Sequence, residues 1–422
     1  MIRVLLALFL IQSSSRIDSA FQKFWTDGNA GDVINAGVTF DDALKRLKAG
    51  RTYAAQKTGV IMLGNTTADG LQHFYAVNIP PNYDPRKRYQ VRFQLHGGVM
   101  GRSSNQPRGN GDIGSLAGVE QIYVLPYAWD EAPWWSEDQL LNLNAILDSL
   151  KRTYNVDENR VVLSGVSDGG TGTFYVAMRN TTPFASFLPL NGFILVLDGG
   201  DLNDGNLPNN LVNKPLFVVN GGRDPLYPTS RTGPGIRHMM DYGVDISYHP
   251  QPGAAHNTAW WPDLRDTYEK FVAGHPRNPH PDKLTWETSD LAHNRAHWLV
   301  IDELGDRPGD AQFTFDVNDD PAAIIPDFAA TTGTMFRWTK KPGRVDLERD
   351  GNTVHVRSRG VAAFTLLLSP DRFDFTKPVK VVVNGRTVFE GLVKKDLKTL
   401  MKWAAVDNDR TMLFGAELKI FC

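Results

Sequence analysis

The stretch Val161-Val162-Leu163-Ser164-Gly165-Val166-Ser167-Asp168-Gly169-Gly170 is the part of this 422-residue chain that decides its fold. Its apolar start predicts a buried strand, and residues 171–178, which follow it, predict a helix. A strand that turns abruptly into a helix at G-x-S-x-G exposes the serine hydroxyl, because the glycines leave room for a tight turn. The motif therefore predicts Ser167 as a nucleophile, and a plain glycine turn is the alternative interpretation.

The segments on both sides of this motif alternate between predicted strands and predicted helices. Apolar runs predict strands at residues 89–95, 121–125, 160–164, 193–197 and 216–220, and amphipathic patterns predict helices at 137–154 and 262–272. Such alternation predicts an α/β fold with a doubly wound, mostly parallel sheet and helices on both faces. In sheets of this kind, ligands bind at the carboxyl ends of the strands.

The chain divides into four predicted segments. Residues 1–20 carry Arg3, the apolar run 4–11 and small residues, a pattern typical of a signal peptide and too short to span a bilayer; a buried first helix or strand is the alternative. Residues 21–275 form the predicted α/β domain with a helical lead-in, 276–282 a proline-rich linker, and 283–422 a smaller β-rich domain. The signal predicts a secreted or periplasmic protein with no transmembrane segment after its removal.

Composition excludes several classes of function. The net charge of −2 gives no basic surface, so no nucleic-acid partner is predicted. The single cysteine, Cys422, excludes a disulfide within the chain and a cysteine-based zinc site. The oxygen-rich clusters 201–205 and 318–320 do not match the spacing of a calcium loop. Neither a metal nor another cofactor is therefore predicted.

A serine hydroxyl needs a base within hydrogen-bond reach, and the base needs a carboxylate to orient it. Asp224 follows the predicted strand 216–220, and His256 lies in a loop before the helix 262–272, which matches the chain order serine, acid, histidine. We predict Asp224 as the acid and His256 as the base. Asp198 is the alternative acid; His249 and His238 are the alternative bases.

Two backbone amides are needed to stabilise the oxyanion of an acyl-transfer transition state. The amide of Asp168, directly after the nucleophile, is the first predicted donor. The second is predicted in the glycine loop after the strand 89–95, with Gly98 preferred over Gly97. A flexible turn without function is the alternative interpretation of this loop.

These motifs together resemble the α/β-hydrolase superfamily over about residues 55–275. Within it, the pattern is most similar to secreted esterases related to feruloyl and acetylxylan esterases and to polyhydroxyalkanoate depolymerases. The resemblance implies carboxylic-ester hydrolysis by a Ser-His-Asp triad through an acyl-enzyme. Prolyl-peptidase domains share the motif order, so a serine peptidase is an alternative, and a non-catalytic binding protein is a second one. The acidic Asp168 departs from the small or apolar residue expected there.

Aromatic residues gather on the loops that should surround the site. Flat rings suit aryl esters or sugar-linked esters, because both groups stack on aromatic faces. The predicted substrate-binding residues are Trp134, Trp135, Tyr227 and Trp260, although burial in the core is the alternative for each tryptophan. The predicted partner is a small-molecule or polymer-borne ester, with carbohydrate as a candidate contact.

Overall fold

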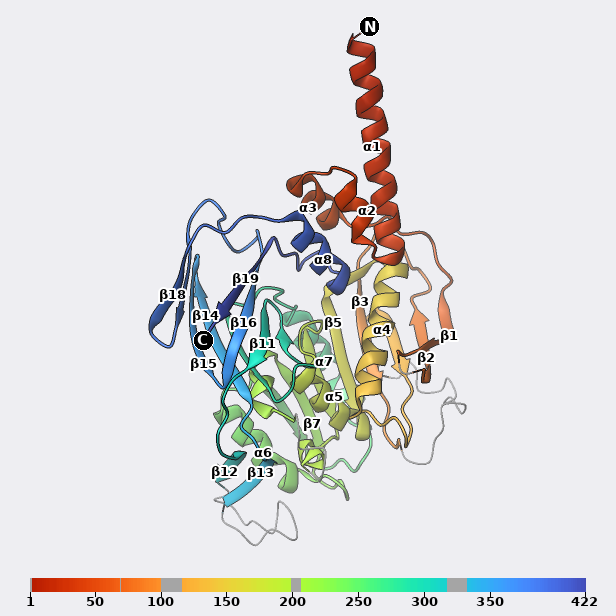
Figure 1. Cartoon of the computed structure of the whole chain (residues 1–422). Coiled ribbons are helices and arrows are strands. Elements are labelled where there is room, and N and C mark those ends of the chain that lie inside the picture. The colour runs from red at the N-terminus through yellow and green to blue at the C-terminus, as the bar shows by residue number, and fades with distance from the viewer. Residues whose placement is uncertain (1, 69, 100–115, 199–205, 317–331) are drawn as a thin grey trace.

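A computed structural model describes residues 2–68, 70–99, 116–198, 206–316 and 332–422 (Figure 1). The chain begins with three helices, α1 (Ile2–Asp27), α2 (Ala30–Asn35) and α3 (Phe40–Ala49). Helices α2 and α3 each begin at a polar N-cap residue. The Asn29 side chain accepts the backbone N–H of Gly31 at the start of α2, and the Thr39 side chain accepts that of Asp42 at the start of α3.

An eight-stranded sheet forms the centre of the molecule, in the order β1-β2-β4-β3-β5-β6-β7-β8. Only β2 runs antiparallel to its neighbours; the remaining strand contacts are parallel. The strands are β1 (Gly59–Thr66), β2 (Gln72–Ile79), β3 (Tyr89–Leu95), β4 (Ile122–Pro126), β5 (Val156–Val166), β6 (Ser186–Leu190), β7 (Leu216–Gly221) and β8 (Ile246–Gln251).

Helices cover both faces of this sheet. On β5, Val161 and Leu163 share a core with α4 (Glu137–Thr153), α5 (Asp168–Arg179) and α6 (Thr229–Asp241). Val162, between them, points to the other face and packs with α7 (Trp261–Gly274). The predicted α/β class with a doubly wound, mostly parallel sheet is confirmed.

One predicted strand is wrong. Residues 193–197 form a short 3-10 helix, η2 (Ile194–Leu197), and the strand next to β5 is instead β6. A buried apolar run has no periodicity that separates strand from helix, and Pro189 within β6 argued against a strand there. Pro189 lies opposite Gly165 in the parallel ladder at the end of β5. A second 3-10 helix, η4 (Pro208–Asn213), follows.

The C-terminal part is β-rich, as predicted. A five-stranded sheet (β18-β17-β15-β14-β9) and a four-stranded sheet (β10-β11-β16-β19) enclose one shared apolar core, and β12 pairs with β13 separately. The elements are β9 (Lys283–Thr288), β10 (Arg295–Ala296), β11 (Leu299–Leu304), β12 (Ala311–Asp316), β13 (Thr332–Trp338), β14 (Gly343–Asp350), β15 (Thr353–Arg359), β16 (Val361–Leu368), β17 (Val379–Val383), β18 (Arg386–Gly391), α8 (Leu397–Asp407) and β19 (Ala416–Phe421).

The N-terminal helices pack on the C-terminal helix. Phe21 and Phe24 of α1 share a buried cluster with Leu400 and Met401 of α8, while the start of α1 projects away from the body (Figure 1). Helix α1 runs through residue 20, so the signal-peptide boundary stays a prediction. Within the described ranges, no helix combines the length and hydropathy needed to cross a bilayer.

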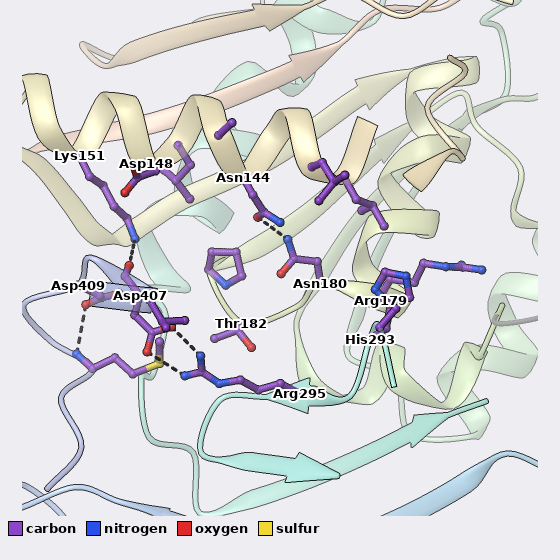
Figure 2. A pocket seen from close by; sticks show the side chains of 18 of the residues that line it. Asn144, Asp148, Lys151, Arg179, Asn180, Thr182, His293, Arg295, Asp407 and Asp409 are labelled. Atoms are coloured by element: carbon purple, nitrogen blue, oxygen red, sulfur yellow. Dashed lines mark hydrogen bonds and ion pairs between the residues drawn. The ribbon is translucent and has the colours of Figure 1, made fainter. Parts of the chain in front are cut away.

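The segment predicted as a linker is packed between the two parts of the chain. Arg277 is buried, donates to the Asn159 side chain and the Thr182 carbonyl, and forms an ion pair of 2.6 Å with Asp409. Close by, Arg295 binds Asp407 through two hydrogen bonds, at the edge of a polar pocket of about 610 Å³ between α4 and α8 (Figure 2). Residues 276–282 therefore join the α/β part to the β-rich part through buried polar contacts.

Candidate active site

Ser167 lies at the turn from β5 into α5 and has a strained backbone. Its φ of 58° and ψ of −118° fall where a residue with a side chain rarely lies, at a typical cost of about 1–3 kcal/mol. The Ser167 amide donates to Leu190 O of β6 at 2.9 Å, and the Ser167 carbonyl accepts from Thr171 N at 3.0 Å. Strand β6 and the first turn of α5 therefore hold the half-buried serine in place.

The glycines of the motif are required by close backbone contacts. A Cβ at Gly165 would lie 2.0 Å from Gly169 O, and one at Gly169 would lie 2.2 Å from Leu95 O. No side chain fits at either position. The serine lies at a tight turn directly after the fifth strand of the sheet, and only β2 of this sheet runs antiparallel to its neighbours. The turn and the strand order together define one fold.

The chain has the α/β-hydrolase fold.

Within this fold, Ser167, His256 and Asp224 form one continuous hydrogen-bond chain. His256 Nε2 lies 2.7 Å from Ser167 Oγ, and His256 Nδ1 lies 2.6 Å from Asp224 Oδ2. The Asp224 side chain is fully buried, and its second oxygen accepts from the amides of Leu226 and Tyr227 at 2.8 and 3.0 Å. A neutral imidazole that donates Nδ1–H to Asp224 keeps Nε2 free to accept the serine proton.

The alternative acid and bases lie elsewhere. The Asp198 carboxylate accepts the backbone N–H of Phe336 in β13, and burial raises its pKa. His249 pairs with Ser247 Oγ at 2.8 Å and stacks on Phe217, and His238 lies within α6. The structure thus brings together the three preferred residues and not their alternatives.

The loop that carries His256 is held by Asn191, a residue that the sequence interpretation missed. Asn191 is fully buried, and its Nδ2 donates to Asn257 O at 2.8 Å, directly after the histidine. Its backbone amide donates to Val219 O of β7 at 2.7 Å. The signal that could have identified Asn191 is its position directly after a strand. Because β6 was not predicted, this position was not recognised.

The glycine loop after β3 lies against the nucleophile. A Cβ at Gly97 would lie 2.8 Å from Ser167 Cβ, so a larger residue would collide with the serine. Asp168 opens α5, and the N–H at the start of a helix has no partner within the helix. Both features agree with the proximity expected of the donors Asp168, Gly98 and Gly97, whose roles stay predictions.

His96 and Trp134 support this loop from the protein interior. The Ala128 amide donates to His96 Nε2 at 3.1 Å, which assigns the ring proton to Nδ1, and Nδ1–H donates to Gly97 O at 2.9 Å. The Trp134 indole N–H donates to His96 O at 2.7 Å.

Two of the four predicted substrate contacts are wrong. Trp134 has no exposed surface, because its ring packs on Gly172 behind the glycine loop. Trp260 is 4% exposed, because it packs in the core under α7. Trp135 is half-buried and packs against the main core.

Tyr227 is the predicted aromatic residue that lies at the triad. It is half-buried, and its ring centre lies 5.8 Å from that of His256 in an edge-on arrangement. Burial, followed by the nearby carboxylates of Asp168 and Asp224, raises the pKa of the Tyr227 hydroxyl. The oxygen-rich clusters 201–205 and 318–320 lie outside the described residues.

No family model matches the chain. A probable feruloyl esterase C of Aspergillus terreus is 28% identical over 171 residues, which are 37% of this chain and 62% of that protein. A bifunctional acetylxylan esterase/xylanase of Neocallimastix patriciarum is 30% identical over 124 residues, 28% of this chain and 17% of that protein. A thermostable esterase of known structure aligns with a TM-score of 0.42 and 20% identity over 52% of this chain and 63% of its own. The chain matches less than two thirds of the length of each.

Proposed function

We propose that this protein is a serine carboxylic-ester hydrolase whose catalytic triad is Ser167, His256 and Asp224. One observation carries the proposal: the unbroken chain of two short hydrogen bonds from Ser167 Oγ through His256 to a buried carboxylate. This arrangement converts a weakly nucleophilic hydroxyl into one whose proton has an acceptor already in place. The names of the two curated relatives, both of which describe esterases, support the same class.

The mechanism is a two-step acyl transfer. His256 takes the proton from Ser167 Oγ as this oxygen attacks the ester carbonyl carbon, and the amides of Asp168 and Gly98 stabilise the oxyanion. His256 then gives the proton to the departing alcohol, which leaves an acyl-enzyme on Ser167. A water molecule, deprotonated by His256, releases the acid by the same steps in reverse order. Asp224 holds the tautomer of His256 throughout.

The substrate class follows from the relatives and from one residue of the site. We propose that the acyl or alcohol part is an aryl, acetyl or polysaccharide-linked group, because the relatives are named for feruloyl and acetylxylan esters. Tyr227 offers a ring next to His256 that would contact such a group. A panel of nitrophenyl acetate, methyl ferulate and acetylated xylan would rank these substrates.

Replacement of Ser167 tests the proposed activity directly. We expect Ser167→Ala to lower kcat on nitrophenyl acetate by several orders of magnitude, because the acyl-enzyme can no longer form. A fluorophosphonate probe should label Ser167 in the wild-type protein, and peptide mapping should find the label on the peptide that contains Gly165–Gly169.

Ser230, exposed on α6, provides the matched control. Ser230→Ala should keep the wild-type rate and the probe label. If Ser167→Ala still turned over esters at the wild-type rate, or if the probe left the wild-type protein unlabelled, the proposed function would be wrong.

A further inference from the structure

The side chain of Asp168 connects the nucleophile turn to the glycine loop. Asp168 Oδ2 accepts the backbone N–H of Val99 at 2.9 Å. Val99 is 1% exposed and directly follows His96-Gly97-Gly98. An acidic residue directly after the nucleophile was unexpected from the sequence, and this hydrogen bond gives it a structural partner.

The start of the same loop, directly after β3, is fixed by a different residue. Trp134 Nε1–H donates to His96 O at 2.7 Å, and His96 donates to Gly97 O. Between these two anchors lie Gly97 and Gly98, which have no side chains to pack. Gly98 has a φ of 61°, a conformation that glycine adopts without strain. The position of the Gly98 amide therefore depends on what holds the loop at His96 and at Val99.

We propose that Asp168 is a positioning residue that aligns the two oxyanion donors with each other. Its own amide is one proposed donor, and its carboxylate fixes the loop that carries the other. Asp168 therefore holds both donor amides, and the distance between the amides of Asp168 and Gly98 does not depend on the conformational freedom of the glycines. The acceptor oxygen, and not the charge of the carboxylate, is what this role requires, because a carbonyl oxygen in the same place also accepts a backbone N–H. The inference rests on the proposed ester hydrolysis.

Two variants separate a hydrogen-bond role from a general effect on folding. Asp168→Ala removes the acceptor of the Val99 amide, and Asp168→Asn keeps one carbonyl oxygen in the same place without the charge. We expect Asp168→Ala to lower kcat on nitrophenyl acetate by about 10- to 100-fold with little change in KM, because a displaced donor weakens binding of the transition state alone. Asp168→Asn should recover most of this loss.

Hydrogen–deuterium exchange of the Val99 amide tests the contact without any substrate. Exchange should be faster in Asp168→Ala than in the wild-type protein, and Asp168→Asn should restore the protection. The melting temperature of both variants should stay close to that of the wild type, so that a loss of rate is not a loss of folded protein.

The outcomes of these experiments distinguish a failure of the positioning role from a failure of the proposed ester hydrolysis. If the wild-type protein hydrolyses no ester, the proposed function fails while the exchange result still reports on the contact. If the wild type is active and Asp168→Ala keeps its kcat, the positioning role is wrong. If Asp168→Asn loses as much rate as Asp168→Ala, the negative charge and not the hydrogen bond matters, and the inference is also overturned.

Discussion

At the scale of single residues, the site depends on the hydrogen bond that sets the tautomer of His256. Asp224 accepts from Nδ1 with one oxygen, and two backbone amides occupy the other oxygen. Asp224→Asn would present an amide group, whose NH₂ donates to Nδ1 and leaves the ring proton on Nε2. That tautomer cannot accept the proton of Ser167, so we expect kcat to fall by about 10³- to 10⁴-fold on nitrophenyl acetate.

Asp198 provides the comparison for this prediction. It also follows an apolar run, but its carboxylate binds the backbone of Phe336. Asp198→Asn should therefore leave kcat and KM unchanged within error in the same assay. A loss in this variant as large as that in Asp224→Asn would contradict the assignment of the acid.

The sequence was sufficient to predict Ser167, His256 and Asp224, because each residue belongs to a short motif that follows a predicted strand or precedes a predicted helix. It could not place the tryptophans. Trp134 and Trp260 lie on loops between predicted elements, where composition does not tell whether a ring faces the solvent or the core. The deciding contact for Trp134 is a hydrogen bond to His96 O, 38 residues away in the chain. Long-range backbone contacts of this kind leave no local pattern.

At the scale of elements, α7 follows the His256 loop and is anchored to β3 by a buried ion pair. Arg92 is fully buried and binds Glu269 through two hydrogen bonds of 2.9 and 2.8 Å. Removing the carboxylate would leave a buried guanidinium without its counter-charge, which typically costs about 3–5 kcal/mol. We expect Glu269→Ala to lower the free energy of unfolding by about this amount in urea titrations.

The same helix offers a matched control. Asp266 pairs with Arg265, but both side chains are largely exposed, at 86% and 52%. Asp266→Ala should change the free energy of unfolding by no more than about 1 kcal/mol, because solvent screens an exposed pair. Equal losses in the two variants would show that burial does not determine the contribution of these pairs.

Helices and strands with a regular pattern of apolar residues could be predicted from the sequence. Elements whose structure depends on pairing with neighbouring strands could not. Helix α4 was expected within one residue of its observed end, because Ser136 caps it and its apolar face repeats regularly. Strand β6 was missed, since its five residues are all buried and include Pro189. Its identity as a strand comes from pairing with β5 and β7 on either side, which the local sequence does not encode.

At the scale of the whole molecule, buried polar contacts connect the β-rich part to the central sheet. Arg410 binds Glu158 of β5 at 2.5 Å, and Arg277 binds Asp409 with both side chains almost fully buried. Lys151 of α4 donates to Asp407 O at the end of α8 (Figure 2). Because charges buried in this way need their partners, the two parts are expected to unfold together.

This junction also contains a buried histidine that should make the whole molecule sensitive to acid. Burial, opposed by Asp371 and Asp409 and reinforced by Arg277, lowers the pKa of His280 from 6.5 to about 4. Between these values, the unfolded chain binds a proton that the folded chain does not. The free energy of unfolding should therefore fall as the pH drops from about 6.5 to 4, by on the order of 3 kcal/mol from this group.

Below pH 4 both states carry the proton, so His280 adds no further loss there. His297, fully buried next to Lys214 and Arg277, also has a pKa well below 6.5 and should act in the same direction. Urea titrations at several pH values should show a shallower fall for His280→Gln than for the wild type, because one of the two groups is gone. His355→Gln, at an exposed position on β15, should keep the wild-type slope. Identical slopes in the His280→Gln and wild-type proteins would mean that the buried junction is not where acid destabilises the fold.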